Sequence, residues 1–152
     1  MRRIVVLGVF LLACGPAVAD PPVPVELLRS TPPTCVAERF GRISVQLGSP
    51  EPNTNTGMAP TPVSYQKAFA KLQKAAGERG GHAVVLRAHE AKFYTKGTRV
   101  AQRPTFVKLS GDVVTMKRDL QGCRVVPLDV AQFVDDALQQ EREQVTLHTS
   151  KN

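Results

Sequence analysis

The cysteines are the residues whose chemistry follows most directly from the sequence. Cys14 lies in an apolar leader. Either cleavage of that leader or lipidation of Cys14 leaves Cys35 and Cys123 as the free thiols. Two cysteines in an exported chain normally pair, because the compartment is oxidising. A redox or metal-binding pair would favour a C-x-x-C spacing or nearby histidine ligands, which the sequence lacks. We therefore expect a structural disulfide between Cys35 and Cys123.

The histidines are the next candidates for chemistry, and there are three: His82, His89 and His148. His82 and His89 are seven residues apart on a predicted strand, so they face opposite sides and cannot share an ion unless a bulge intervenes. His89 and Glu90 are a conceivable acid–base pair, but neighbouring strand residues also face apart. The sequence contains no nucleotide-binding, metalloprotease or serine-hydrolase motif. We expect no catalytic residue, no metal site and no cofactor.

Basic residues form the remaining candidate site. The chain has 20 Lys and Arg against 13 Asp and Glu; loss of Arg2 and Arg3 with a leader leaves 18, or a net charge of +5. Such a surface could contact anionic lipid, lipopolysaccharide or an acidic protein, or it could simply be solvated. Nucleic acid is not expected, since aromatic residues for base stacking are few and there is no Trp. The candidate residues are Lys67, Lys71 and Lys74 on a predicted helix, and Lys92, Lys96, Arg99 and Arg103 near a predicted turn.

The first twenty residues resemble an export signal. A basic start is followed by a ten-residue apolar run, Ile4–Ala13, which is too short to span a bilayer as a helix. Ala17-Val18-Ala19 predicts a signal peptide over residues 1–19. Leu11-Leu12-Ala13-Cys14 resembles a lipobox, which predicts instead a lipoprotein signal over residues 1–13 with Cys14 lipidated. Both alternatives predict an exported protein, in the periplasm or anchored at the outer membrane.

The mature chain is expected to contain one folded domain with polar ends. Residues 20–34 are rich in proline, which predicts a tether, although Val25–Leu28 could add a short edge strand. Residues 35–145 are expected to form a single domain, and residues 146–152 a polar tail that frays. Within the domain, residues 48–62 are rich in turn-forming residues and predict a long loop, either binding or mobile.

One stretch, Ser64–Leu86, predicts the central unit of the domain. Its apolar residues recur at helical spacing from Tyr65 to Ala76, and the hydroxyl of Ser64 could cap the helix. Glycines at 77, 80 and 81 supply the left-handed residue that ends a helix. Ala83–Leu86 then forms a short apolar run, typical of a strand buried on both faces.

Three further elements complete the predicted fold. Residues 39–47 alternate between apolar and polar, which predicts a strand with one covered face. Residues 105–116 predict another strand, in which Ser110-Gly111-Asp112 forms a bulge rather than a tight turn. Residues 129–140 predict a second helix capped by Asp129. We expect an α+β fold: a small three- to four-stranded, mainly antiparallel sheet with one packed helix, plus a C-terminal helix.

This order of elements resembles that of small bacterial α+β domains. They include the heavy-metal-binding domain family and the outer-membrane lipoprotein that senses envelope stress for the Rcs phosphorelay. The resemblance covers roughly residues 39–117 and implies an exported, non-enzymatic domain that contacts other envelope proteins. The residues that carry it are Ala68, Leu72, Ala76, Gly80-Gly81-His82-Ala83-Val84-Val85 and Ser110-Gly111-Asp112-Val113.

We therefore expect a non-enzymatic cell-envelope protein with an interaction or sensor-like role and an envelope protein as its partner. A lipid on Cys14 would anchor it to a membrane. The alternative is a periplasmic module that binds a metal or a small anion.

Overall fold

Three long strands, β2 (Val36–Gly48), β3 (Ala83–Lys96) and β4 (Arg99–Met116), form the main part of the sheet. The computed structural model describes residues 24–49, 61–96, 99–119 and 121–149. The predicted leader with Cys14, most of the predicted 48–62 loop and the last three residues therefore lie outside the described residues. The remaining elements are β1 (Glu26–Ser30), a 3-10 turn (Pro33–Cys35), α1 (Tyr65–Glu78), β5 (Val126–Pro127) and α2 (Val130–Thr149).

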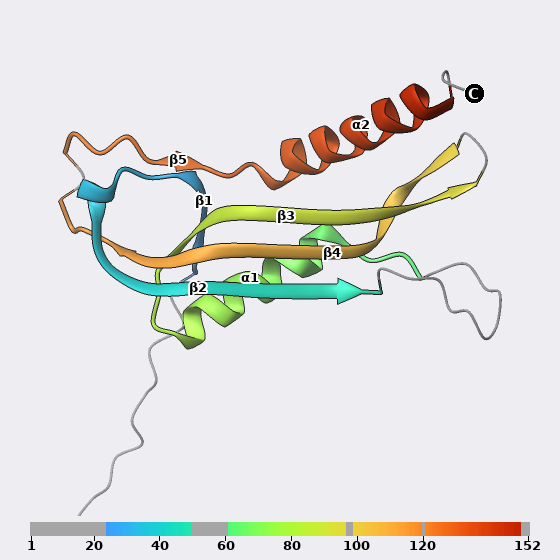
Figure 1. Cartoon of the computed structure of the whole chain (residues 1–152). Helices are drawn as coiled ribbons and strands as arrows, with labels where there is room; N and C mark the ends of the chain where they lie inside the picture. Colours follow the sequence, from blue (N-terminus) through green and yellow to red (C-terminus); the bar gives the residue numbers. More distant parts are fainter. Residues whose placement is uncertain (1–23, 50–60, 97–98, 120, 150–152) are drawn as a thin grey trace, which may run out of the picture.

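The α+β class is confirmed, but the predicted number of strands is wrong. The sheet has five strands in the order β2-β4-β3-β1-β5 (Figure 1). β1 lies within the segment predicted to be a tether and overlaps Val25–Leu28, where a short edge strand is the predicted alternative. It runs parallel to β3, with Leu27 opposite Val84. It lies between β3 and β5 and is not an edge strand. Leu28 is almost completely buried, which explains why so short a segment joins the sheet.

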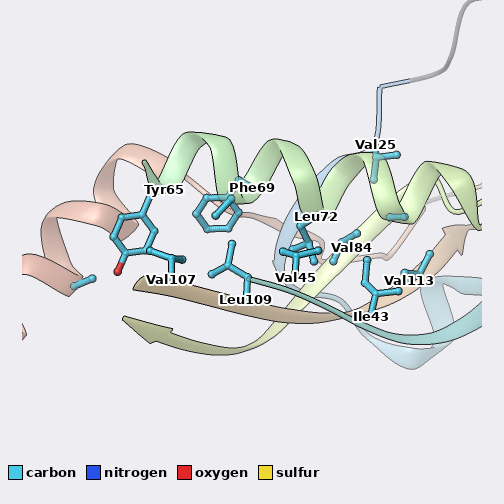
Figure 2. Packing of buried hydrophobic residues seen from close by; sticks show 13 residues of the cluster. Val25, Ile43, Val45, Tyr65, Phe69, Leu72, Val84, Val107, Leu109 and Val113 are labelled. Carbon is cyan, nitrogen blue, oxygen red and sulfur yellow. The ribbon is translucent and has the colours of Figure 1, made fainter. Parts of the chain in front are cut away.

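α1 supplies one side of the main hydrophobic core, and its predicted position is confirmed. Its buried side chains pack on the sheet (Figure 2). Gly80, just after the helix, has a φ of 79°, the left-handed conformation predicted for its end. The predicted cap at the start is wrong, because the Ser64 side chain makes no capping hydrogen bond. The core includes Ile43, Val45, Tyr65, Ala68, Phe69, Leu72, Ala76, Val84, Val107, Leu109 and Val113.

β3 is buried on both faces at its start, as predicted. Val84 belongs to the main core under α1, whereas Ala83 and Val85 belong to a second cluster on the opposite face. That cluster also contains Leu28 and Val114, with Val125 packed against it. A strand that lies between two apolar layers has no solvent-facing side, which accounts for its continuous apolar sequence.

A bulge occurs beside Gly111, but it belongs to β3. β4 is one continuous strand, and its register with β2 is regular from Arg42 to Gly48. Between β3 and β4, Leu86 lies opposite Gly111 and Ala88 lies opposite Ser110, which leaves Arg87 as the extra residue. The prediction of a single long strand is confirmed, whereas its assignment of the bulge to residues 110–112 is wrong. The extra residue also reverses which face the following β3 side chains occupy.

The disulfide between Cys35 and Cys123 is confirmed. Their Cα atoms are 5.7 Å apart, and 88 positions of sequence separate them. Cys35 is completely buried, and the backbone N–H of Lys117 donates to its carbonyl oxygen over 3.0 Å. The disulfide thus attaches the segment after β4 to the start of β2. A disulfide is compatible with an exported protein.

α2 is longer than predicted and extends into the predicted polar tail. Asp129 caps it as expected, because its Oδ1 accepts from the backbone N–H of Ala131 at 2.9 Å and of Gln132 at 3.1 Å. Phe133 and Ala137 pack against the main core. The residues beyond the apolar face are mostly Gln, Glu and Arg, which favour helix without needing a packed face. Neither α2 nor α1, the two α-helices of the described residues, is long and apolar enough to cross a membrane.

We predict that Gly111→Ala lowers the free energy of unfolding by about 1–3 kcal/mol, because its methyl group overpacks the core. A Cβ atom at this position would lie 2.5 Å from Val84 Cγ1 and 2.8 Å from the carbonyl oxygen of Val85. Gly77→Ala is the matched control: its Cβ would lie 3.5 Å from Val25 Cγ2, and a helical alanine should stabilise by up to ~1 kcal/mol. Urea denaturation measures both variants, and an equal effect of the two substitutions would contradict the packing argument.

We also predict that reducing the disulfide lowers the free energy of unfolding by up to about 4 kcal/mol, because the unfolded chain loses a long covalent loop. Denaturation with and without reductant measures the difference, and Cys35→Ser/Cys123→Ser should unfold like the reduced protein. The intact mass of the unreduced protein should be two hydrogens below that of the dithiol. Two free thiols in the native protein would contradict the disulfide.

Candidate functional site

The predicted cations of α1 lie on its outward face, but they do not share the same surroundings. All three lysines are exposed. The Nζ of Lys71 reaches the edge of the sheet and donates to the carbonyl oxygen of Gln46 over 3.3 Å. Lys74 forms a weak ion pair with Glu78, with N and O 3.9 Å apart. Lys67 lies near the start of the helix and lines a groove.

The predicted cations of the β3–β4 hairpin lie toward its tip. Lys92, Arg99 and Arg103 are exposed. Lys96 is paired with Arg99 through the backbone at the end of the hairpin, and its side chain is not among those described. Within the described part of the chain, neither Lys67 nor the exposed hairpin cations lie within 4.0 Å of a carboxylate. The structure brings Lys67 and Arg103 to one groove and leaves the other cations elsewhere on the surface.

The groove surrounds the N-terminal end of α1 and has a volume of about 1010 Å³. Its walls come from α1, the start of α2, β1 and the β2 and β4 ends near Leu47 and Pro104. The basic side chains of Lys67 and Arg103 contribute to its lining, as do the acidic side chains of Asp129 and Asp135. An apolar lining with a few charged groups is typical of a binding site. The apolar residues that line it are Leu27, Leu47, Pro62, Val63, Phe69, Pro104, Val130, Ala131 and Val134.

A Tyr65–His89 pair lies next to this groove, and the sequence did not predict it. The hydroxyl of Tyr65 and Nε2 of His89 are 2.6 Å apart. The Phe133 ring of α2 meets the His89 ring edge-on, with centroids 4.9 Å apart. The sequence predicts that His82 and His89 face opposite sides of one strand unless a bulge intervenes. The Arg87 bulge does intervene, and it turns His89 toward the helices. His82 precedes β3 and is exposed.

Burial controls the protonation of this pair. It lowers the pKa of His89, which favours the neutral ring. It also raises the pKa of Tyr65, and the negative charge of Glu141 raises it further. A neutral imidazole can accept the hydrogen bond that the Tyr65 hydroxyl donates. The pair therefore links α1 to β3 beneath α2, and the tyrosine keeps its proton.

The opposite face of the sheet carries a second charged cluster around Asp112. Arg42 donates to Oδ1 over 3.0 Å and Arg87 donates to Oδ2 over 2.7 Å. Partial burial by itself would raise the pKa of Asp112, but the two hydrogen bonds and the two positive charges lower it overall. These two arginines are neutralised by a shared carboxylate, unlike the cations of the hairpin.

The described residues contain no group of three or more metal-ligating side chains. No family model matches this chain, and no curated protein matches it. The groove and the distribution of charge are therefore the features of the described residues that bear on function.

We predict that stability decreases as the pH falls below about 6.5, and that His89 causes much of this decrease. Burial holds the pKa of His89 in the folded state below its ordinary value of 6.5, so the unfolded chain takes up the proton first. The contribution is present above pH 6.5 and is lost progressively as the pH falls from that value through the lower pKa of the folded state. Melting temperatures of wild type and His89→Gln between pH 7.5 and 5.5 measure the effect. His82→Gln should retain the wild-type slope, and an unchanged slope in His89→Gln would refute the assignment.

Proposed function

We propose that this is an exported bacterial cell-envelope protein that acts by binding an envelope protein partner, in an interaction or sensor-like role without catalysis. The observation that carries the proposal is the groove at the end of α1, where an apolar lining lies beside Lys67 and Arg103, two cations that have no carboxylate within 4.0 Å among the described residues. An uncompensated charge beside exposed apolar surface is more useful to a binding surface than to stability.

The composition of the groove indicates what kind of partner it suits. Its apolar side chains can bury those of a protein segment, and burial of such anchors supplies most of the binding energy at interfaces. Lys67 and Arg103 can contact a carboxylate of that segment at the rim, which mainly accelerates association and selects the partner. The partner we propose is therefore an acidic protein surface with projecting apolar side chains.

The location in the envelope is supported by the disulfide and by the predicted export signal. The buried Cys35–Cys123 disulfide suits an oxidising compartment. Lipidation of Cys14 remains part of the proposal, since that residue lies outside the described ones. In a lipidated protein, the proline-rich residues before β1 would separate the folded domain from the membrane surface.

The same two cations also give the alternative an observation in its favour. A small anion could bind between Lys67 and Arg103, which would make the protein an anion-binding module of the periplasm. A metal has no comparable support among the described residues. Competition by a small anion distinguishes the two functions. If the site binds a small anion, a second small anion should displace it at low concentration. If the site binds a protein, the anion should weaken that contact only through general screening.

We predict that a photo-reactive amino acid at position 67 or 103 crosslinks to one and the same envelope protein in intact cells. The control position is Arg118, which is exposed and follows β4, at the opposite end of that strand from Arg103. Lys67→Glu/Arg103→Glu should reduce crosslinking from a third groove position, Gln66, by about tenfold, because it places like charges opposite an acidic partner.

Equal crosslinking from positions 67, 103 and 118 would contradict the proposal, and so would the absence of any protein adduct from the groove. Equilibrium dialysis against inorganic phosphate tests the alternative, which predicts saturable binding that Lys67→Glu/Arg103→Glu abolishes.

A further inference from the structure

The outer edge of β2 is a second surface that the groove does not include. β2 is the first strand in the sheet order β2-β4-β3-β1-β5, so β4 is the only strand of the described residues that pairs with it (Figure 1). It spans Val36–Gly48 and is 13 residues long. Its alternate residues Ile43 and Val45 are buried, whereas Arg42, Ser44 and Gln46 are exposed. A long edge strand presents unpaired backbone groups that another strand can bind.

The hydrogen-bond pattern identifies which backbone groups point outward. The N–H of His82 donates to the carbonyl of Val114 over 3.1 Å, so the backbone N–H and carbonyl groups of even-numbered β4 residues point toward β3. Their odd-numbered neighbours point toward β2, because backbone groups alternate in direction along a strand. Gly111 and Leu109 lie opposite Ile43 and Val45. These pairs hold β2 to β4 and leave the N–H and carbonyl groups of Arg42, Ser44 and Gln46 on the outer edge.

Two side chains of the helical layer reach around to this edge. Lys71 Nζ donates to the carbonyl of Gln46 over 3.3 Å. Arg79 Nη1 donates to the carbonyl of Arg42, also over 3.3 Å. Both bonds are exposed and long, so they are weak and easily exchanged for other partners. They lie on either side of Ser44 and place two positive charges along the edge.

These charges decide what can pair with β2. A second copy of the chain would bring Lys71 and Arg79 of both molecules together, and like charges across paired strands are destabilising. An extended segment with carboxylates on alternate residues would instead meet both cations. Its backbone would bond the outward groups of Ser44, while its remaining side chains would lie beside Arg42 and Gln46.

We propose that the outer edge of β2 is a strand-addition site for an extended acidic segment of a protein partner. The inference rests on the proposed function, because the partner is a protein, but it uses a different surface from the groove. The carboxylates of the added strand bind Lys71 and Arg79, which exchange their bonds to β2 carbonyls for ion pairs. The backbone of the added strand satisfies the outward groups at Ser44.

A labelled ten-residue peptide of alternating threonine and glutamate is the probe, since threonine favours strands and suits the polar face beside Ser44. Fluorescence anisotropy with the full mature protein should show saturable binding that weakens with salt. The matching threonine–lysine peptide should not bind. On binding of the acidic peptide, hydrogen exchange should slow at the amides of Ser44 and Gln46, a change that surface charge alone would not produce.

Two variants separate an edge site from general attraction between opposite charges. Lys71→Glu/Arg79→Glu should weaken binding about tenfold or more, as expected for reversal of two contacting charges. Lys92→Glu/Arg99→Glu changes the net charge equally but uses exposed residues outside both the edge and the groove, so it should retain most of the affinity. Ser44→Pro removes an outward N–H without breaking a bond to β4, and the variant should fold because proline is tolerated at an edge. It should also abolish binding, because the added strand loses a backbone partner at Ser44.

Equal loss in the two charge-reversed variants would overturn the proposal, as would unchanged exchange at Ser44. Dimerisation of the protein through β2, detected by ultracentrifugation and prevented by Ser44→Pro, would identify a second copy as the occupant and also refute it. If Ser44→Pro does not fold, the charge-reversed variants and hydrogen exchange still test whether the β2 edge is the binding site. Crosslinking from the groove is independent of these variants, so loss of edge binding with intact groove crosslinks would refute only this inference.

Discussion

The contact between α1 and the three long strands controls where every other surface of the molecule lies. Phe69 and Leu72 are buried against side chains from β2, β3 and β4, and burial on this scale contributes about 2 kcal/mol per large side chain. Within the sheet under this helix, Val84 and Val85 of β3 leave no room for a side chain at Gly111. Because the helix is fixed over β2 and β4, its polar side chains are held beside the outer edge of the sheet and its first turn beside α2.

The two layers on β3 explain how so small a domain is held together. The main core lies beneath α1, and a smaller cluster around Leu28 and Val85 lies on the other face. The disulfide attaches the segment that borders the second cluster to the start of β2. Because the apolar area of the second layer is small, this layer depends on the covalent link, as is common in small exported domains.

The charged residues fall into two groups with different consequences. On the face opposite α1, Asp112 neutralises Arg42 and Arg87, and this cluster contributes modestly to stability because its arginines are exposed. Around α1 and the hairpin, most cations have no carboxylate partner among the described residues. Cations of this second group lie beside two features that can accept a partner: the groove, which also carries Asp129 and Asp135, and the β2 edge.

The helix α1, the strands β2 to β4 and the disulfide could be predicted from the sequence, because each follows from local periodicity or from simple pairing. The place of β1 inside the sheet, the Arg87 bulge and the Tyr65–His89 contact could not. A five-residue strand has too few positions to show which strands it pairs with, and a single extra residue reverses a face without any local signal. The basic residues themselves are visible in the sequence. Their division between groove, hairpin and sheet edge arises only when α1 is packed over β2 and β4, because packing brings together residues that are distant in the chain.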